Sequence, residues 1–214
     1  MNLERITYAA NTPKARLILA HGAGAGNQHE FMDDFAKKLA TKGVEVISFN
    51  FPYMQVAYET EKKRPPNSNK QLVAHFAAEI EMTDSDLPLF IAGKSMGGRV
   101  ATQIMASEIA STASGCIVLG YPFIPPGKPE KLEERTKHFT DINKPLLILQ
   151  GERDTFGGTK LLSEITLPDA FQLSWVPSGD HSFKPLKSSG LTQEQNIEFA
   201  AIQTSNFIDS IIEG

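Results

Sequence analysis

The stretch Gly93-Lys-Ser-Met-Gly-Gly98 follows directly on the apolar run 87–92 and is the most specific indication of the fold in this chain. It places Ser95 two positions from a glycine on either side, in the pattern G-x-S-x-G. Where a strand turns sharply into a helix at such a serine, side chains two positions away would collide, so glycine is required there. The sequence therefore predicts a tight strand-to-helix turn, and it poses the question whether this turn presents a nucleophile.

Short apolar runs alternate with helix-like patterns along the rest of the chain. Apolar stripes at helical spacing fall in 31–40, 72–80, 100–109 and 192–212. The apolar runs are bounded by Gly, Pro or polar residues and cover 16–20, 44–49, 87–92, 116–119, 145–150 and 171–176, with an edge strand or hairpin expected over 3–10. This alternation predicts an α/β fold with a mostly parallel, doubly wound sheet and helices on both faces.

Length and spacing predict one domain without a cap. The 214 residues are enough for one substantial core, so we expect a single domain over 1–214. The segments 53–69 and 121–129 read as ordered loops over the sheet. Between 116 and 145 there is room for one short helix, over 130–139, and not for a cap domain.

Composition excludes several classes of partner. The net charge is −4, so no basic surplus points to nucleic acid or to an acidic lipid surface. No apolar stretch approaches the ~18 residues of a membrane span. The start, MNLERITYAAN, lacks the apolar core of a signal peptide, and we expect a cytoplasmic protein. The single cysteine, Cys116, cannot form an intrachain disulfide. The choice between monomer and homodimer stays open.

A serine nucleophile needs a general base and an acid that orients it. Asp154 follows the run 145–150 and His181 follows the run 171–176. The ends of parallel strands meet at one edge of a sheet, so both side chains are expected beside Ser95. Glu152 and Asp180 are the rival acids and are expected to be solvated charges. Of the other histidines, 29, 75 and 138 are expected in surface or structural roles.

The oxyanion formed by attack of Ser95 would need two donors fixed in advance. The Met96 amide at the start of the following helix is the first. The second is expected from the loop His21-Gly-Ala-Gly-Ala-Gly26, where we favour the Ala23 amide and leave Gly22 and Gly24 open. His21 is expected to hold this loop. The glycine spacing is not G-x-G-x-x-G, and no metal-ligand cluster is evident, so neither cofactor nor metal is expected.

The segments HGAGAG (21–26), GKSMGG (93–98), GERD (151–154) and GDHSF (179–183) resemble the α/β-hydrolase superfamily, over nearly the whole chain from residue 17. Within it the chain resembles the small, capless, dienelactone-hydrolase-like group. FNFPYM (49–54), KKRPPN (62–67) and GYPFIPPGKPEKL (120–132) are similar to a bacterial subgroup related to the hydrolase-like domains of a testis-expressed protein and of a histone acetyltransferase complex subunit.

This resemblance implies Ser95 as nucleophile, Asp154 as acid and His181 as base. Dienelactone hydrolase itself is similar to enzymes with a cysteine nucleophile, so its substrate is not implied. We expect a serine hydrolase that cleaves a carboxylic ester or thioester of a small-molecule acyl substrate through an acyl-enzyme on Ser95. The alternatives are a binding or scaffold protein that keeps the fold, and a small peptidase.

Aromatic and apolar residues of the two long loops are candidates for the substrate pocket. They either form its wall or pack the loops onto the sheet, and the sequence favours neither. The candidates are Tyr53, Met54, Tyr121 and Phe123.

Overall fold

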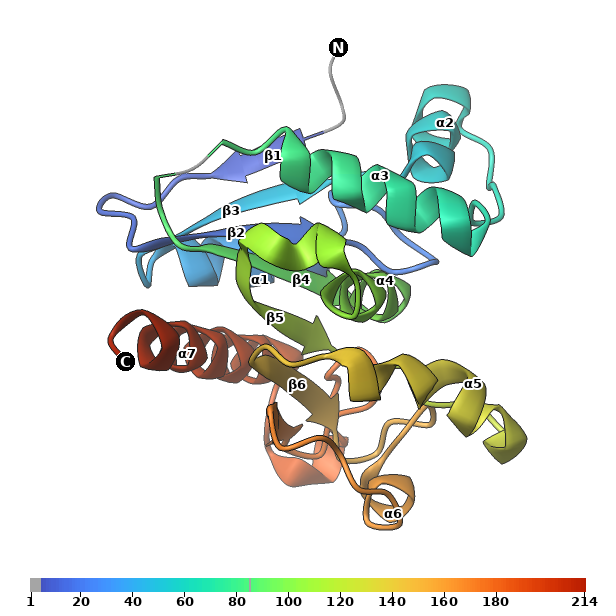
Figure 1. The fold of residues 1–214 in the computed structure, drawn as a ribbon. Coiled ribbons are helices and arrows are strands. Elements are labelled where there is room, and N and C mark those ends of the chain that lie inside the picture. Colours follow the sequence, from blue (N-terminus) through green and yellow to red (C-terminus); the bar gives the residue numbers. More distant parts are fainter. Residues whose placement is uncertain (1–4, 85) are drawn as a thin grey trace.

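The computed structural model describes residues 5–84 and 86–214 and has a seven-stranded sheet at its centre (Figure 1). The strand order is β1-β3-β2-β4-β5-β6-β7, and all neighbours are parallel except β1, which runs antiparallel to β3. The expected doubly wound α/β fold is confirmed. The strands are β1 (Arg5–Tyr8), β2 (Ala15–Ala20), β3 (Val44–Phe49), β4 (Leu89–Lys94), β5 (Ala113–Leu119), β6 (Leu146–Gly151) and β7 (Phe171–Val176).

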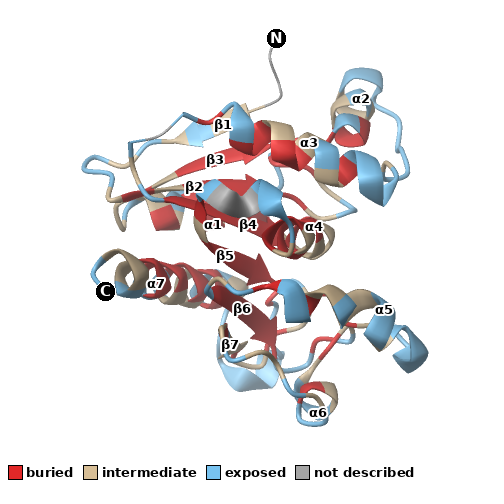
Figure 2. Ribbon diagram, in the orientation of Figure 1, coloured by how far each residue is buried: buried red, intermediate tan, exposed pale blue. Residues whose placement is uncertain are grey.

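Helices cover both faces of this sheet, as the alternating pattern predicts. One face is covered by α1 (Glu30–Ala40) and α7 (Gln193–Ile212), and the other by α3 (Asn69–Glu81) and α4 (Met96–Met105). Figure 2 shows the resulting buried strands between partly exposed helices. Ser68 begins α3 with a capping box that it shares with Gln71, so a local polar signal fixes where this helix starts.

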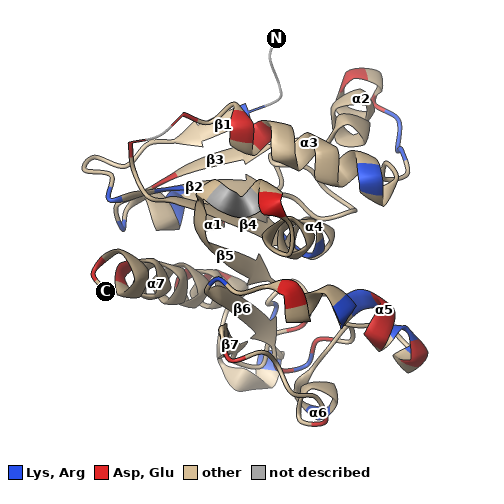
Figure 3. Cartoon of the chain, in the orientation of Figure 1, with Lys and Arg blue, Asp and Glu red and all other residues tan. Residues whose placement is uncertain are grey.

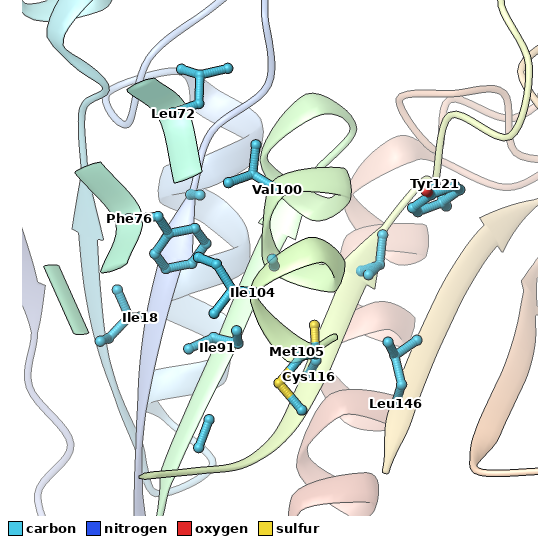
Figure 4. Packing of buried hydrophobic residues seen from close by; sticks show 14 of the residues in the cluster. Ile18, Leu72, Phe76, Ile91, Val100, Ile104, Met105, Cys116, Tyr121 and Leu146 are labelled. Atoms are coloured by element: carbon cyan, nitrogen blue, oxygen red, sulfur yellow. The ribbon is translucent and has the colours of Figure 1, made fainter. Parts of the chain in front are cut away.

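The core consists of two apolar layers, one on each side of the sheet. In β4, Ile91 faces the α3/α4 layer, while Phe90 and Ala92 face the α1/α7 layer. Figure 4 shows Phe76 and Ile104 packed from their two helices toward Ile91. Burial of one such side chain contributes about 2 kcal/mol. The period-two alternation of a strand therefore decides which layer each side chain joins.

Several boundaries differ from those expected, and β5, expected over 116–119, begins at Ala113. The strand expected over 87–92 begins at Leu89, because Pro88 has no N–H for the ladder; its carbonyl still accepts the Arg16 N–H at 3.0 Å. The helix expected over 100–109 ends at Met105, and a 3-10 turn, η1 (Glu108–Thr112), follows. Residues 3 and 4 of the expected edge strand lie outside the described residues.

The loop expected over 53–69 is wrong in its first half, which forms α2 (Pro52–Thr60). Pro52 occupies the first turn, where its fixed φ suits a helix and its missing N–H is not needed. Tyr53 and Met54 are buried and hold the helix against the core. Glu61 then ends it in a left-handed conformation.

Between β5 and β6 the described chain carries only short elements and no cap domain. They are η2 (Pro129–Lys131), α5 (Leu132–Thr136) and η3 (Lys137–Asp141), and further on come α6 (Thr159–Leu162) and η4 (Lys187–Ser189). Charged residues belong mainly to helices and loops, and the strands contain few (Figure 3). Among the described residues, no helix combines the length and apolar character needed to cross a bilayer.

Candidate active site

Ser95 occupies a strained turn between β4 and α4. Its φ of 51° and ψ of −113° are unusual for a residue with a side chain. A Cβ on Gly93 would lie 2.2 Å from the Gly97 carbonyl carbon, and one on Gly97 would lie 2.5 Å from the His21 carbonyl oxygen. A Cβ on Gly98 would lie 2.5 Å from Val118. All three positions therefore require glycine for steric reasons.

The structure brings Ser95, His181 and Asp154 into one chain of hydrogen bonds. His181 Nε2 lies 2.8 Å from Ser95 Oγ, and His181 Nδ1 lies 2.8 Å from Asp154 Oδ2. A carboxylate beside Nδ1 favours the tautomer with its proton on that nitrogen, so Nε2 is free to accept the proton of the serine hydroxyl. The three side chains follow β4, β6 and β7, whose carboxyl ends meet at this edge of the sheet.

The Asp154 carboxylate is completely buried and fully hydrogen-bonded. Besides His181, its Oδ2 accepts a hydrogen bond from Gln150 Nε2 at 2.8 Å, and its Oδ1 accepts the Phe156 N–H at 2.8 Å. Gln150 is itself fixed, because its Oε1 accepts the Tyr121 N–H at 2.7 Å. A buried carboxylate needs hydrogen-bond donors to replace water, and Gln150 and the Phe156 N–H supply them. The same donors keep the carboxylate oriented toward His181.

The loop that carries His181 is held from several sides. The Asn196 side chain in α7 donates to the carbonyls of Pro177 at 3.0 Å and Phe183 at 2.8 Å. The Phe156 ring stacks on the imidazole with a centroid separation of 4.2 Å and an interplanar angle of 29°. Asn196 and Phe156 therefore fix the loop and the ring in place.

The glycine loop before α1 lies against the turn that carries Ser95. His21 is buried, which lowers its pKa to about 4. Its Nε2 accepts the Phe51 N–H at 3.0 Å, and its Nδ1 donates to the Gly22 carbonyl at 2.6 Å. The Tyr53 hydroxyl donates to the Ala23 carbonyl at 3.0 Å. The neutral imidazole and the phenol therefore hold this loop by its carbonyl groups.

Two amide groups near Ser95 remain free to donate. In the described part of the chain, the Ala23 and Met96 N–H groups donate to no backbone or side-chain acceptor. Met96 opens α4, where the helix dipole favours negative charge. A Cβ on Gly22 would lie 3.6 Å from the Ser95 Cβ, so the two segments are in close contact.

A pocket of about 340 Å³ opens beside Ser95 and His181. Of the two roles that the sequence left open for Tyr53, Met54, Tyr121 and Phe123, the structure shows the packing role and corrects the pocket-wall role. All four are buried and pack in the α3/α4 core layer, because the loops fold down onto the sheet. The residues that line the pocket are Gly22, Ala23, Gly24, Ala25, His29, Met32, Lys94, Ser95, Phe156, His181 and Ser182.

The rival acids lie apart from the imidazole nitrogens. Glu152 accepts the Ser178 N–H at 2.7 Å. Asp180 accepts the N–H groups of Ser182 and Lys184 at 2.8 Å and 3.0 Å, so it shapes the loop. In residues 5–84 and 86–214, no group of three or more His, Cys, Asp or Glu side chains is arranged to hold a metal ion.

The other histidines have structural partners. His29 caps α1 by accepting the Phe31 N–H at 3.2 Å, and it also lines the pocket. His75 Nε2 lies 3.2 Å from the Asn50 carbonyl, and His138 Nε2 lies 2.9 Å from the Thr102 hydroxyl.

Comparison with known proteins agrees with this fold. Residues 13–209 match the alpha/beta hydrolase domain family, and the chain belongs to this family. A search of the curated proteins found no match by sequence. Solved structures of similar fold include Est1E from Butyrivibrio proteoclasticus with ferulic acid bound, at TM-score 0.72 and 14% identity, covering 98% of this chain and 95% of that one.

Two further structures are similar over most of both chains. An alpha-beta serine hydrolase homologue from Coxiella burnetii has TM-score 0.71 and 14% identity, covering 94% of this chain and 90% of that one. Dienelactone hydrolase from Anabaena variabilis has TM-score 0.70 and 16% identity, covering 97% and 91%. At these identities the likeness establishes the fold, and the substrate has to be argued from the site.

Proposed function

We propose that the protein is a serine hydrolase that cleaves a carboxylic ester or thioester through an acyl-enzyme on Ser95. The observation that carries this proposal is the unbroken contact from Ser95 Oγ through the His181 ring to Asp154, with 2.8 Å at each step. It is supported by the strained turn that holds Ser95 at the rim of a pocket. A hydroxyl so placed has its general base within hydrogen-bonding reach.

In the first half of the reaction, His181 Nε2 takes the Ser95 proton as Oγ attacks the acyl carbonyl carbon. The carbonyl oxygen becomes an oxyanion, to which the free Ala23 and Met96 amides are proposed to donate. Asp154 holds the Nδ1 proton and stabilises the imidazolium. The tetrahedral intermediate then collapses, His181 protonates the leaving alcohol or thiol, and the acyl group stays on Ser95.

In the second half, water attacks the acyl-enzyme and His181 removes its proton. The same two amides hold the new oxyanion. Collapse releases the carboxylic acid, and the imidazolium returns its proton to Ser95. The stacked Phe156 ring covers one face of the imidazole and keeps it in plane through both steps.

The pocket volume favours a small substrate, since ligand pockets commonly span ~300–1,000 Å³ and this one is near the lower end. The test is a panel of p-nitrophenyl acyl esters and acyl-CoA thioesters, with Ser95→Ala as the blank. We expect saturable turnover of short acyl chains by the wild type. Wild-type rates equal to the blank on every ester and thioester would contradict the proposal, and cleavage of aminoacyl anilides alone would indicate a peptidase.

A further inference from the structure

Lys94, the residue before Ser95, extends along the pocket. It ends β4 on the face of Phe90 and Ala92, so its side chain lies on the α1/α7 side at the carboxyl edge of the sheet. The stem passes Gly22, whose built Cβ would lie 4.0 Å from Lys94 Cγ. The Nζ atom lies 4.6 Å above the centre of the Phe31 ring. Lys94 thus lines the pocket, and its Nζ lies between the Phe31 ring and the His181 carbonyl.

This amino group has few partners. Nζ donates to the His181 carbonyl at 2.9 Å, and no carboxylate of the described residues pairs with it at ion-pair distance. Asp154 and Asp180 act on it from farther away, and both are already engaged, one with His181 and Gln150 and the other with backbone amides.

Burial lowers the pKa of Lys94 to about 8, and the two distant carboxylates only partly oppose this. The group therefore remains largely protonated near neutral pH, although it is poorly solvated. The half-buried ammonium of Lys94 has three N–H donors, and one of them is used by the His181 carbonyl. An anion that enters the pocket would supply the missing acceptor and countercharge.

The rest of the lining is suited to an anion. Among the described residues that line the pocket, Lys94, His29 and His181 carry basic side chains, and none carries a carboxylate. Beside Lys94, the glycine loop contributes Gly22, Ala23, Gly24 and Ala25, which have no bulky side chains. A negatively charged group attached to the acyl substrate would thus meet basic side chains in the lining, while the nearby carboxylates of Asp154 and Asp180 lie outside it.

We propose that Lys94 forms a carboxylate-binding subsite, and that the preferred substrates are esters or thioesters that also carry a free carboxylate, such as the mono-esters of short dicarboxylic acids. This inference rests on the hydrolase function proposed above. Lys94 binds the free carboxylate, while Ser95 attacks the carbonyl carbon at the esterified end. The products are the alcohol or thiol and the dicarboxylic acid.

The test compares mono-p-nitrophenyl esters of succinic, glutaric and adipic acid with p-nitrophenyl esters of butanoic, pentanoic and hexanoic acid. Each pair has equal carbon number, and the Ser95→Ala protein gives the background for self-hydrolysis. We expect the wild type to favour the charged member of at least one pair by about 10- to 100-fold in kcat/KM, the usual effect of one charge-assisted hydrogen bond. The gain should lie mainly in KM.

Three variants separate recognition of charge from support of the His181 loop. Lys94→Met removes the charge and the contact with the His181 carbonyl, and Lys94→Gln keeps a donor without the charge. Loss of the contact with the His181 carbonyl affects the charged and the uncharged ester of a pair equally. The ratio of their kcat/KM values therefore measures only the effect of the free carboxylate. We expect both variants to bring this ratio close to 1, whereas Lys62→Met, at an exposed lysine, should preserve it.

The outcomes distinguish the subsite from the hydrolase function. Hydrolysis of both series with a wild-type ratio near 1, or a ratio unchanged in Lys94→Met, would overturn the subsite and leave the hydrolase proposal standing. If the kcat/KM ratio is kept in Lys94→Gln but lost in Lys94→Met, the subsite recognises a hydrogen-bond donor and not a charge, which would refute the proposal. If no ester is hydrolysed and no fluorophosphonate reacts with Ser95, the hydrolase proposal fails, and the subsite proposal fails with it.

Discussion

Substitution of Gly93 by alanine tests whether the turn at Ser95 is as crowded as the structure indicates. The new methyl group would lie 2.2 Å from the Gly97 carbonyl carbon, 2.4 Å from the Gly98 nitrogen and 2.5 Å from the Gly97 oxygen. Ordinary contacts between carbon atoms lie near ~3.5–4.0 Å, so the backbone would have to withdraw by more than ~1 Å. These atoms belong to the first turn of α4, which cannot move without displacing Ser95.

The magnitude follows from two opposing effects. Overpacking of this kind costs about 1–3 kcal/mol, and the backbone clash places this site toward the upper end. Restriction of the unfolded chain returns about 0.4–1 kcal/mol. We therefore expect Gly93→Ala to lose about 2 kcal/mol of unfolding free energy, which lowers the urea midpoint by roughly 0.8 M when m is about 2.5 kcal/mol/M.

The assay is urea unfolding followed by the fluorescence of Trp175, the single tryptophan. Gly24→Ala is the matched control, because a Cβ on Gly24 meets no heavy atom within 4 Å, and its midpoint should change little. A Gly93→Ala midpoint equal to that of Gly24→Ala would refute the steric reasoning.

Three further predictions follow from the same contacts. His181→Ala should lower kcat for p-nitrophenyl esters by several orders of magnitude, as in catalytic triads generally, and a kcat within tenfold of wild type would remove His181 from the mechanism. Asn196→Ala should lose about 1–3 kcal/mol in urea unfolding, because the buried Phe183 carbonyl and the half-buried Pro177 carbonyl lose their donor; an unchanged midpoint would count against that role. Burial lowers the pKa of His138 to about 4, so the unfolded chain binds one more proton there between pH 4 and 6.5 and stability falls as the pH drops through this window. His138→Gln should reduce the loss of unfolding free energy between pH 7 and 4, as measured by urea unfolding. If wild type and variant lose the same unfolding free energy over this range, burial does not lower the pKa of His138.

The sequence predicted the parts of the structure that depend on local patterns. Apolar runs bounded by Gly and Pro predicted the strands, and the G-x-S-x-G pattern located the turn into α4. Because parallel strands end at one edge of the sheet, the positions of Asp154 and His181 after two of these runs were enough to expect them beside Ser95. No knowledge of side-chain packing was needed for these predictions.

Features that depend on packing could not be predicted in this way. The helix α2 has a weak apolar stripe, and it forms because Tyr53 and Met54 find places in the core. The same burial removes these two side chains from the pocket wall. Tyr53 instead supports the glycine loop through its hydroxyl.

The supporting residues of the site were missed for a similar reason. Gln150 is a polar residue at the end of an apolar run, and this was the only signal that it might orient Asp154. Phe156 lies two residues beyond Asp154 in a turn, and only the fold shows that its ring stacks on His181. Nothing in the pattern around Lys94 distinguishes it from a solvated charge, and only the structure places it in the pocket lining.

The central claim is that the Ser95 hydroxyl is an activated nucleophile, and mass spectrometry of the protein after reaction with a fluorophosphonate tests it most directly. We predict one adduct per chain, located on Ser95 by peptide mapping, absent in Ser95→Ala and formed far more slowly in His181→Ala. A folded wild-type protein that stays unmodified, or that reacts at the same rate after loss of the imidazole, would contradict the account.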